Sequence, residues 1–173
     1  MKSFLIIPMG GSGTRFVDKG YKTYKAFLPV DKNINIFEGI ISNFKKLDIE
    51  IIIIANFKTL NNRYNKYLKK NNHHLIDIKS HKKGPVYAVS FIYDLIEDDE
   101  EVIVNYCDFG TYWCYEDFLT HTRNRNADGA IPSYKGFHPH MLGSTNYAFM
   151  RDDKQWMLEI KEKAPFTDNR TQE

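Results

Sequence analysis

The residues most able to do chemistry near the start of the chain form a glycine-rich segment, PMGGSGTRF, over residues 8–16. The segment follows directly on the apolar run Phe4–Ile7, which predicts a strand buried on both faces. Glycines let backbone N–H groups approach a phosphate closely, and loops at the carboxyl ends of parallel strands are where α/β proteins bind ligands. The segment therefore predicts a phosphate-binding loop.

Two common phosphate loops do not match this segment. A Walker loop needs a lysine and a hydroxyl residue directly after its last glycine, and no glycine here has them. A dinucleotide loop would use Gly11 and Gly13, but it needs a third glycine where this chain has Phe16. What remains is Gly-Gly-Ser-Gly-Thr-Arg, followed by Lys25 in the run Lys-Ala-Phe-Leu-Pro-Val.

A carboxylate follows a second predicted strand. Asp108 comes shortly after the apolar segment Glu101–Asn105, so it is expected at the same edge of the sheet as the glycine-rich loop. Asp108, Phe109 and Gly110 also spell a protein-kinase motif, but the catalytic-loop segment that accompanies that motif in kinases is missing from the sequence. The kinase interpretation is therefore rejected.

Together these residues resemble the opening signature of the sugar-1-phosphate nucleotidyltransferases, the nucleoside-diphosphate-sugar pyrophosphorylases. The matching residues are Gly10, Gly11, Gly13, Thr14, Arg15, Lys25, Pro29 and Val30. The resemblance runs from residue 4 to about residue 166. It implies an α/β fold, a three-layer sandwich with a mainly parallel mixed sheet, of the nucleotide-diphospho-sugar transferase (GT-A, Rossmann-like) type.

The resemblance also implies roles for individual residues. The residues expected to bind the nucleotide, by cradling its phosphates or contacting its base, are Gly10, Gly11, Ser12, Gly13, Thr14 and Gly84. The residues expected to carry the catalysis are Arg15, Lys25 and Asp108, with Asp108 also binding Mg²⁺, a hard cation that suits oxygen ligands. The residues expected to contact the acceptor are Gly143, Glu162 and Lys163.

The implied reaction is attack by a phosphate oxygen of a small acceptor, such as a sugar 1-phosphate, on the α-phosphorus of a nucleoside triphosphate, with release of pyrophosphate. The nucleophile is already ionised at neutral pH, so catalysis rests on positioning and charge neutralisation. Segments 131–134 and 162–167 resemble those of bacterial capsule or lipopolysaccharide-type members, which implies a role in surface polysaccharide biosynthesis. The sequence defines neither the base nor the acceptor.

The chain departs from the family pattern in three places. Cys107 stands where the family more often has glycine, Ala164 separates Lys163 from the following proline, and the chain ends before the segment that supplies a second aspartate. We therefore expect residues 1–173 to form a single nucleotidyltransferase-like domain, the N-terminal and central part of a longer fold. Two alternatives stay open: a glycosyltransferase of related fold, although its Asp-x-Asp motif is missing, and a nucleotide-binding regulatory module without turnover.

Hydrophobic periodicity predicts the elements that must position these residues. Strands are expected at Phe4–Ile7, Ile49–Ala55, Leu75–Ile78, Glu101–Asn105, Ala127–Pro132, Asn146–Met150 and Trp156–Ile160. Helices are expected at Ile36–Leu47 with Asn35 as its N-cap, at Phe57–Lys70, from Pro85 to Ile96 and at Tyr115–Thr122. The alternation predicts βαβ units and a mainly parallel sheet, with an antiparallel addition near the end of the chain.

The histidines and the basic helix have simpler interpretations than a metal or nucleic-acid site. His138 and His140 flank a proline and would share one face of a strand, but no third histidine or cysteine ligand lies near them in the sequence. The basic helix at residues 58–70 is expected to be a solvated face. No nucleic-acid partner is therefore predicted.

Composition excludes several other classes. The chain has 173 residues, of which 42% are hydrophobic and 27% charged, with a net charge of +2, which is typical of a globular domain and not of a strongly basic nucleic-acid binder. Two cysteines rule out a disulfide scaffold or zinc ribbon. No apolar run approaches the ~20 residues of a membrane span, and no signal-peptidase site follows the first strand, so a cytoplasmic protein is expected. A homo-oligomer is left open.

Overall fold

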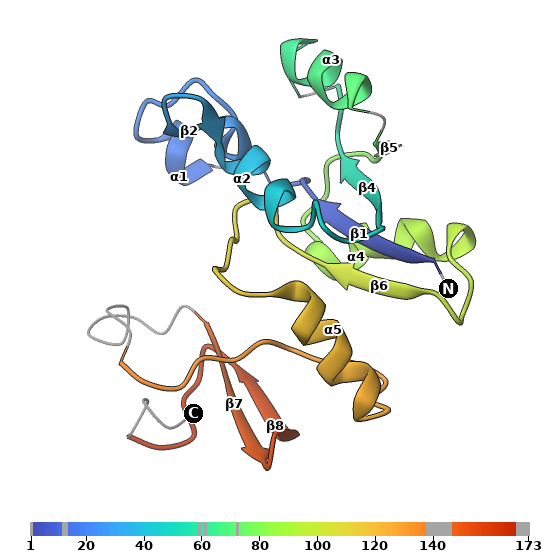
Figure 1. The fold of residues 1–173 in the computed structure, drawn as a ribbon. Helices are drawn as coiled ribbons and strands as arrows, with labels where there is room; N and C mark the ends of the chain where they lie inside the picture. Colours follow the sequence, from blue (N-terminus) through green and yellow to red (C-terminus); the bar gives the residue numbers. More distant parts are fainter. Residues whose placement is uncertain are drawn as a thin grey trace. The chain divides into compact units, whose positions relative to one another are not determined.

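Figure 1 shows the fold of the chain in a computed structural model. The structure describes residues 2–11, 14–58, 60, 62–71, 73–137 and 147–168, without the side chains of residues 14, 15, 62 and 63. The chain divides into two compact units, Met1–Leu119 and Thr120–Glu173, each of which is described by itself.

The first unit is built on a parallel sheet of four strands. The strands are β1 (Ser3–Pro8), β4 (Glu50–Ala55), β5 (His74–Asp77) and β6 (Glu101–Val104), in the order β5-β4-β1-β6. Ile6 of β1 is in register with Ile52 of β4 on one side and with Val104 of β6 on the other. The predicted parallel α/β sheet is confirmed, and its central strands come from the apolar runs that predicted them.

Helices cover both faces of this sheet. On one face Leu5 and Ile7 pack with Phe37 in a core below α2 (Ile36–Asn43) and α3 (Asn62–Lys70). On the other face Phe4 and Ile6 pack against α4 (Pro85–Val89) and η2 (Ser90–Leu95), a 3₁₀ helix. Because successive residues of a strand face opposite sides, one apolar run supplies both cores. The unit therefore has the expected three layers.

The predicted helix at Ile36–Leu47 begins where its cap indicates. Asn35 Oδ1 accepts a hydrogen bond of 2.9 Å from the Glu38 N–H, and the Asn35 N–H donates to Glu38 Oε2 at 3.0 Å. This reciprocal pair is a capping box, which satisfies two backbone donors at the start of the helix. The N-cap prediction is confirmed, although regular α-helix ends earlier, at Asn43.

Two helices differ from their predicted bounds. The helix expected from Phe57 begins only at Asn62, and two side chains bond to the backbone of Phe57. Its N–H donates to Asp77 Oδ1 at 3.0 Å, and its carbonyl accepts from Asn65 Nδ2 at 2.8 Å. The helix expected from Pro85 is α-helical only through Val89 and continues as η2.

The remaining elements of the first unit are short. They are α1 (Thr14–Val17), η1 (Lys25–Phe27), the antiparallel pair β2 (Pro29–Asp31) and β3 (Ile34–Asn35), and the start of α5 (Tyr115–Asn124), within which the boundary between the units falls. Tyr115 packs on Phe44 with 4.1 Å between ring centroids. This contact fixes the first turn of α5 on the same core as α2.

The second unit contains an antiparallel pair, β7 (Ala148–Asp153) and β8 (Trp156–Glu162). This pair confirms the antiparallel addition near the chain end. The prediction of a strand at Ala127–Pro132 was wrong, because these residues form no strand. Gly129 and Pro132 are both unfavourable in the hydrogen-bonded interior of a sheet. None of the helices in the described ranges has the length and apolar character needed to cross a bilayer.

Candidate active site

The strand order of the first unit reverses beside β1. The chain runs from β1 to β4 and β5 on one side, and then returns to place β6 on the other side of β1. In open parallel sheets, ligands bind outside the carboxyl ends of the strands at such a switch point. The loops that leave β1 and β6 there are the predicted glycine loop and the segment that carries Asp108.

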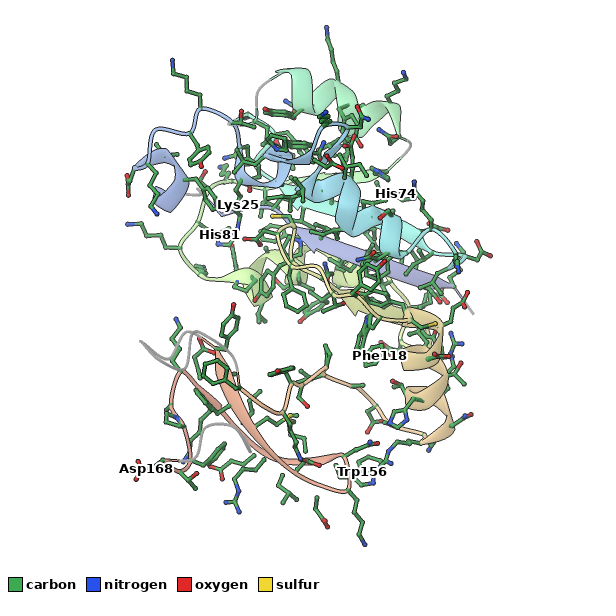
Figure 2. The ribbon with its side chains drawn as sticks, turned by 60° about the vertical axis from the view of Figure 1, so that its left-hand side comes forward. Lys25, His74, His81, Phe118, Trp156 and Asp168 are labelled. Atoms are coloured by element: carbon green, nitrogen blue, oxygen red, sulfur yellow. The ribbon has the colours of Figure 1, made fainter. Side chains whose placement is uncertain are left out.

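Figure 2 shows Lys25 and His81 toward one end of the sheet and His74 toward the other. His74 is the first residue of β5, where it is in register with Ile52 of β4. The end of the sheet near His74 is therefore the amino end of the strands. A Cβ added to Gly10, two residues past the end of β1, would lie 3.9 Å from His81 Nε2. The candidate site of the first unit is therefore at the carboxyl end of the sheet.

The glycine loop is tied to the protein by its backbone. The Met9 N–H donates to the carbonyl of Ile54 at 2.7 Å, which extends the pairing of β1 with β4 past the strand end. The Tyr24 hydroxyl approaches two carbonyls, that of Met9 at 2.5 Å and that of Gly11 at 3.0 Å. Gly10 and Gly11 are exposed. The first two glycines of the predicted loop therefore lie open to solvent on an anchored backbone.

The rest of the predicted loop is only partly described. Ser12 and Gly13 lie outside the described residues. Thr14 and Arg15 open α1, and their side chains also lie outside the described part of the chain. The expected roles of these four residues at a phosphate therefore stay predictions.

Two of the predicted catalytic residues lie together. Lys25 Nζ donates to Asp108 Oδ2 at 2.9 Å, across 83 residues of sequence. The lysine side chain is 20% exposed and the carboxylate 38% exposed, so both remain within reach of a ligand. Lys25 opens η1, where its carbonyl accepts from the Leu28 N–H at 3.2 Å. The pair joins a cation and an anion at the switch point.

A buried asparagine shapes the turn that carries Asp108. Asn105 is 7% exposed, and its Nδ2 donates to the carbonyls of Tyr106 and Phe109, each at 2.9 Å. Its backbone N–H donates to the carbonyl of Ile6 at 3.0 Å, which ties the turn to β1. Asn105 thus places the carboxylate relative to the glycine loop.

Electrostatics at the site follow from burial. Burial of the hydroxyl raises the pKa of Tyr24, and the nearby Cys107 and Asp108 raise it further. Burial raises the pKa of the Cys107 thiol to about 11, with Lys25 acting in the opposite direction. Cys107 is 1% exposed, so its thiol stays protonated and unreactive and contributes only packing. Cys107 stands where the family more often has glycine, and Asp108 still lies in the turn that follows β6.

The segment before α4 adds a histidine to the site. His81 Nδ1 accepts from the Lys83 N–H at 3.3 Å, so in the neutral ring Nε2 carries the proton. Nε2 is buried and makes no hydrogen bond in the structure. The ring packs edge-on against Tyr87 at 4.8 Å between centroids. Gly84 caps α4 with a φ of 84°, a conformation that favours glycine, and it is exposed.

The residues expected at the acceptor belong to the second unit. Lys163 Nζ lies 3.5 Å from Glu162 Oε1, and the Lys163 N–H donates to the carbonyl of Tyr147 at 3.2 Å. Lys163 has a φ of 57° at the end of β8, so its backbone turns out of the strand. Gly143, His138 and His140 lie outside the described residues. The acceptor contacts therefore remain predictions.

The donor set around Asp108 suits Mg²⁺ in one particular way. Within the described part of the chain, no three histidine, cysteine, aspartate or glutamate side chains gather where they could hold a metal ion. Mg²⁺ in nucleotide enzymes commonly takes one or two carboxylates, with phosphate oxygens and water completing its shell. A partly exposed Asp108 near the glycine loop fits that arrangement.

Three residues of this site were not predicted: Tyr24, Asn105 and His81. Tyr24 bonds to backbone carbonyls 15 and 13 residues away and His81 lies against Gly10, which leaves no motif, while Asn105 bonds within its own turn. A local signal existed in each case, since Tyr24 precedes Lys25, Asn105 directly follows the apolar run of β6 and His81 lies three residues before Gly84.

Solved structures with a similar fold include a nucleoside-diphosphate-sugar pyrophosphorylase from Vibrio cholerae, with a TM-score of 0.68 and 17% identity over 95% of this chain and 68% of that one. A mannose-6-phosphate isomerase from Helicobacter pylori has a TM-score of 0.67 and 18% identity over 95% and 61%. A UDP-glucose pyrophosphorylase complexed with UDP-glucose has a TM-score of 0.65 and 16% identity over 98% and 73%. At identities this low, the similarity establishes the fold alone. The structural similarity confirms the expected nucleotidyltransferase type of α/β fold.

Comparison with curated protein sequences finds no match. The model of one protein family, the MobA-like NTP transferase domain, matches residues 5–164. That range contains nearly the whole chain, including the glycine loop, Lys25 and Asp108. The chain therefore belongs to the family of MobA-like NTP transferase domains.

Proposed function

We propose that this protein joins a nucleoside triphosphate to a small phosphorylated acceptor, most simply a sugar 1-phosphate, and releases pyrophosphate. The observation that carries the proposal is the contact of 2.9 Å between Lys25 and Asp108 at the switch point, next to an anchored glycine loop. A cation for phosphate and a carboxylate for a metal ion are the two charges that phosphoryl-type transfer requires at one place.

In the proposed reaction, a phosphate oxygen of the acceptor attacks the α-phosphorus of the triphosphate. A new P–O bond forms, the bond between the α-phosphorus and the bridging oxygen to the β-phosphorus breaks, and pyrophosphate leaves with that electron pair. No proton needs to be removed, because the acceptor phosphate is ionised at neutral pH. The absence of a nucleophile–base pair from the predicted site residues agrees with this chemistry.

The chain's own residues then act by binding and by charge. The backbone of the segment 10–14 cradles the triphosphate, and Arg15 and Lys25 neutralise it and stabilise the leaving pyrophosphate. Lys25 exchanges its partner Asp108 for a phosphate oxygen, and Asp108 is released to a cation. Since the pair is partly exposed, this exchange costs little: exposed ion pairs contribute about 0–1 kcal/mol.

Asp108 is the residue that would hold Mg²⁺, which when bound neutralises and orients the phosphate oxygens. His81 lies beside Gly10 of the glycine loop, and His81 and Gly84 would bind the nucleotide from the α4 side. Glu162 and Lys163, with Gly143, would contact the acceptor. A phosphate partner suits the Lys163 ammonium, and sugar hydroxyls suit the Glu162 carboxylate.

The similar pyrophosphorylase with bound UDP-glucose supports a sugar 1-phosphate as acceptor, while the similar mannose-6-phosphate isomerase shows that the fold alone does not decide it. The biological setting that we propose is the supply of nucleotide-activated precursors for bacterial surface polysaccharides, on the resemblance of segments 131–134 and 162–167. We further propose that residues 1–173 act as one nucleotidyltransferase-like domain.

The test is thermal stabilisation by ATP, CTP, GTP, UTP and dTTP, each with and without Mg²⁺, followed by pyrophosphate release with a panel of sugar phosphates. A ligand at about 100 times its Kd adds ~2.7 kcal/mol to the stability of the folded state, which is readily measured. Stabilisation by one nucleotide, followed by pyrophosphate release with one acceptor, supports the proposal. Stabilisation without release under any acceptor would favour a binding module instead.

A further inference from the structure

The hydroxyl of Tyr24 is shared by two carbonyls of the glycine loop. It lies 2.5 Å from the Met9 oxygen and 3.0 Å from the Gly11 oxygen, on either side of Gly10. A hydroxyl has one proton, so it donates to both acceptors in a three-centre bond or alternates between them. The loop is thereby fixed at both ends of its first glycine.

This contact also sets the direction of a backbone donor. The chain has no cis peptide bond among its described residues, and in a trans peptide the C=O and the following N–H point in opposite directions. With the Met9 carbonyl held by Tyr24, the Gly10 N–H faces away from that hydroxyl. Gly10 itself is exposed to solvent.

Tyr24 is itself held in place by packing and by a backbone hydrogen bond. Its ring packs against the core of the first unit and lies 6.4 Å from the Phe27 ring, centroid to centroid. Its carbonyl accepts from the Phe27 N–H at 2.9 Å, and the next residue is Lys25, the first of η1. One segment therefore carries both the lysine of the site and the clamp on the glycine loop.

We propose that Tyr24 is a positioning residue of the nucleotide site, which holds the peptide before Gly10 in the orientation that binds a phosphate oxygen and keeps the loop at a fixed place relative to Lys25. The inference rests on the proposed function and deepens it. It assigns to the hydroxyl, and not to the ring, a specific effect on the affinity for the triphosphate.

The experiment compares Tyr24→Phe with a matched control, Tyr67→Phe. Tyr67 also packs its ring in this core, 6.0 Å from Phe27, and its hydroxyl bonds to Glu38, far from the glycine loop. Each variant loses one hydroxyl and keeps its ring. Affinity for the nucleotide, KM for each substrate and melting temperature are measured for both variants and for the unmodified protein.

We expect Tyr24→Phe to weaken nucleotide affinity by about ten-fold, with the KM of the acceptor unchanged. Both variants should lower the melting temperature by a similar amount, but Tyr67→Phe should leave nucleotide affinity unchanged. Equal nucleotide affinity in Tyr24→Phe and the unmodified protein, or equal weakening of both substrates, would overturn the inference alone. Failure of the unmodified protein to bind any nucleoside triphosphate would overturn the proposed function together with it.

Hydrogen exchange at the Met9 amide, which donates to the Ile54 carbonyl at 2.7 Å, supplies a second readout that needs no ligand. Loss of the clamp on the Met9 carbonyl should speed exchange of this amide in Tyr24→Phe by about ten-fold over the unmodified protein, and Tyr67→Phe should leave it unchanged. Unchanged exchange in Tyr24→Phe would contradict the proposed clamp even if the variant bound nucleotide poorly.

Discussion

Lys25 and Asp108 contact each other at 2.9 Å although 83 residues separate them in the chain. Lys25 comes from the 3₁₀ turn after the glycine loop, and Asp108 comes from the turn after β6. Their meeting follows from the order β5-β4-β1-β6, which puts β6 directly beside β1. The parallel sheet thus converts two distant polar residues into one charged pair at its carboxyl end.

The lysine of this pair should matter far more for catalysis than for stability. Lys25→Ala should lower turnover by about 10²–10³-fold, as removal of a single charge-stabilising donor does in other enzymes. The free energy of unfolding of the Lys25→Ala variant should differ from that of the unmodified protein by about 1 kcal/mol or less, because the ion pair is partly exposed. Pyrophosphate release and denaturant unfolding measure the two effects. Lys32→Ala, in the turn between β2 and β3, is the control and should retain full activity; a Lys25 variant with normal turnover would remove this residue from the site.

The aspartate should control the response to metal. Asp108→Asn keeps the shape of the side chain but removes the charge that a hard cation needs. We expect nucleotide binding to lose its enhancement by Mg²⁺, measured by thermal stabilisation over a Mg²⁺ titration. Asp98→Asn, in the exposed turn before β6, should behave as the unmodified protein. An unchanged Mg²⁺ response in Asp108→Asn would exclude the proposed metal role.

Elements that depend on local pattern were predictable. The runs Phe4–Ile7 and Ile49–Ala55 became β1 and β4 because strands buried on both faces need continuous apolar residues. Asn35 capped α2 because a capping box is contained in four consecutive residues. Asp108 was expected beside the glycine loop because it follows a predicted strand at the same sheet edge, whereas Lys25 was expected from the resemblance of its segment to the family signature.

What depends on distant backbone was not predictable. The segment Ala127–Pro132 has the composition of a short strand, yet a strand exists only where a partner pairs with it, and no strand among the described residues pairs with this segment. Phe57 lies before the helix that was expected to start there, with its N–H bonded to Asp77 of β5 and its carbonyl bonded to the Asn65 side chain. Tyr24 escaped prediction for the same reason: its partners are carbonyls 15 and 13 residues away.

The buried asparagine should affect both folding and activity. Asn105→Ala deletes two hydrogen bonds and leaves the carbonyls of Tyr106 and Phe109 without that donor. We expect a loss of about 2 kcal/mol in the free energy of unfolding, together with a fall in turnover, because the Asp108 turn loosens. Asn71→Ala removes a single exposed bond to the Tyr67 carbonyl and should cost far less, with no loss of turnover. Equal effects of the two variants would show that Asn105 has no special place in the site.

His81 should show opposite effects on stability and on binding. Its buried Nε2 makes no hydrogen bond, which is costly in the free protein, while a bound nucleotide would supply an acceptor. His81→Phe keeps an edge-on ring against Tyr87 and removes the unpartnered donor, together with the long, exposed bond of 3.3 Å that Nδ1 accepts from the Lys83 N–H. We expect a melting temperature equal to or above that of the unmodified protein and about ten-fold weaker nucleotide binding.

The control for His81 lies at the other end of the sheet. His74→Phe should leave nucleotide affinity unchanged, because its exposed ring pairs with Glu50 at the amino end of the strands. Nucleotide affinity that stays normal in His81→Phe would show that the ligand does not reach this ring. A lower melting temperature with normal affinity would assign His81 to packing alone.

His73 should make the fold sensitive to mild acid. Burial beside Phe37, at 6.3 Å between ring centroids, lowers the pKa of His73 below its ordinary 6.5. The unfolded chain therefore binds a proton more readily than the folded one, and stability falls as the pH drops below about 6.5. His73→Gln should remove that part of the loss between about pH 7 and pH 5, measured by denaturant unfolding at each pH, whereas His121→Gln, exposed on α5, should keep the original slope. Identical pH profiles for His73→Gln and the unmodified protein would mean that protonation of this ring does not oppose folding.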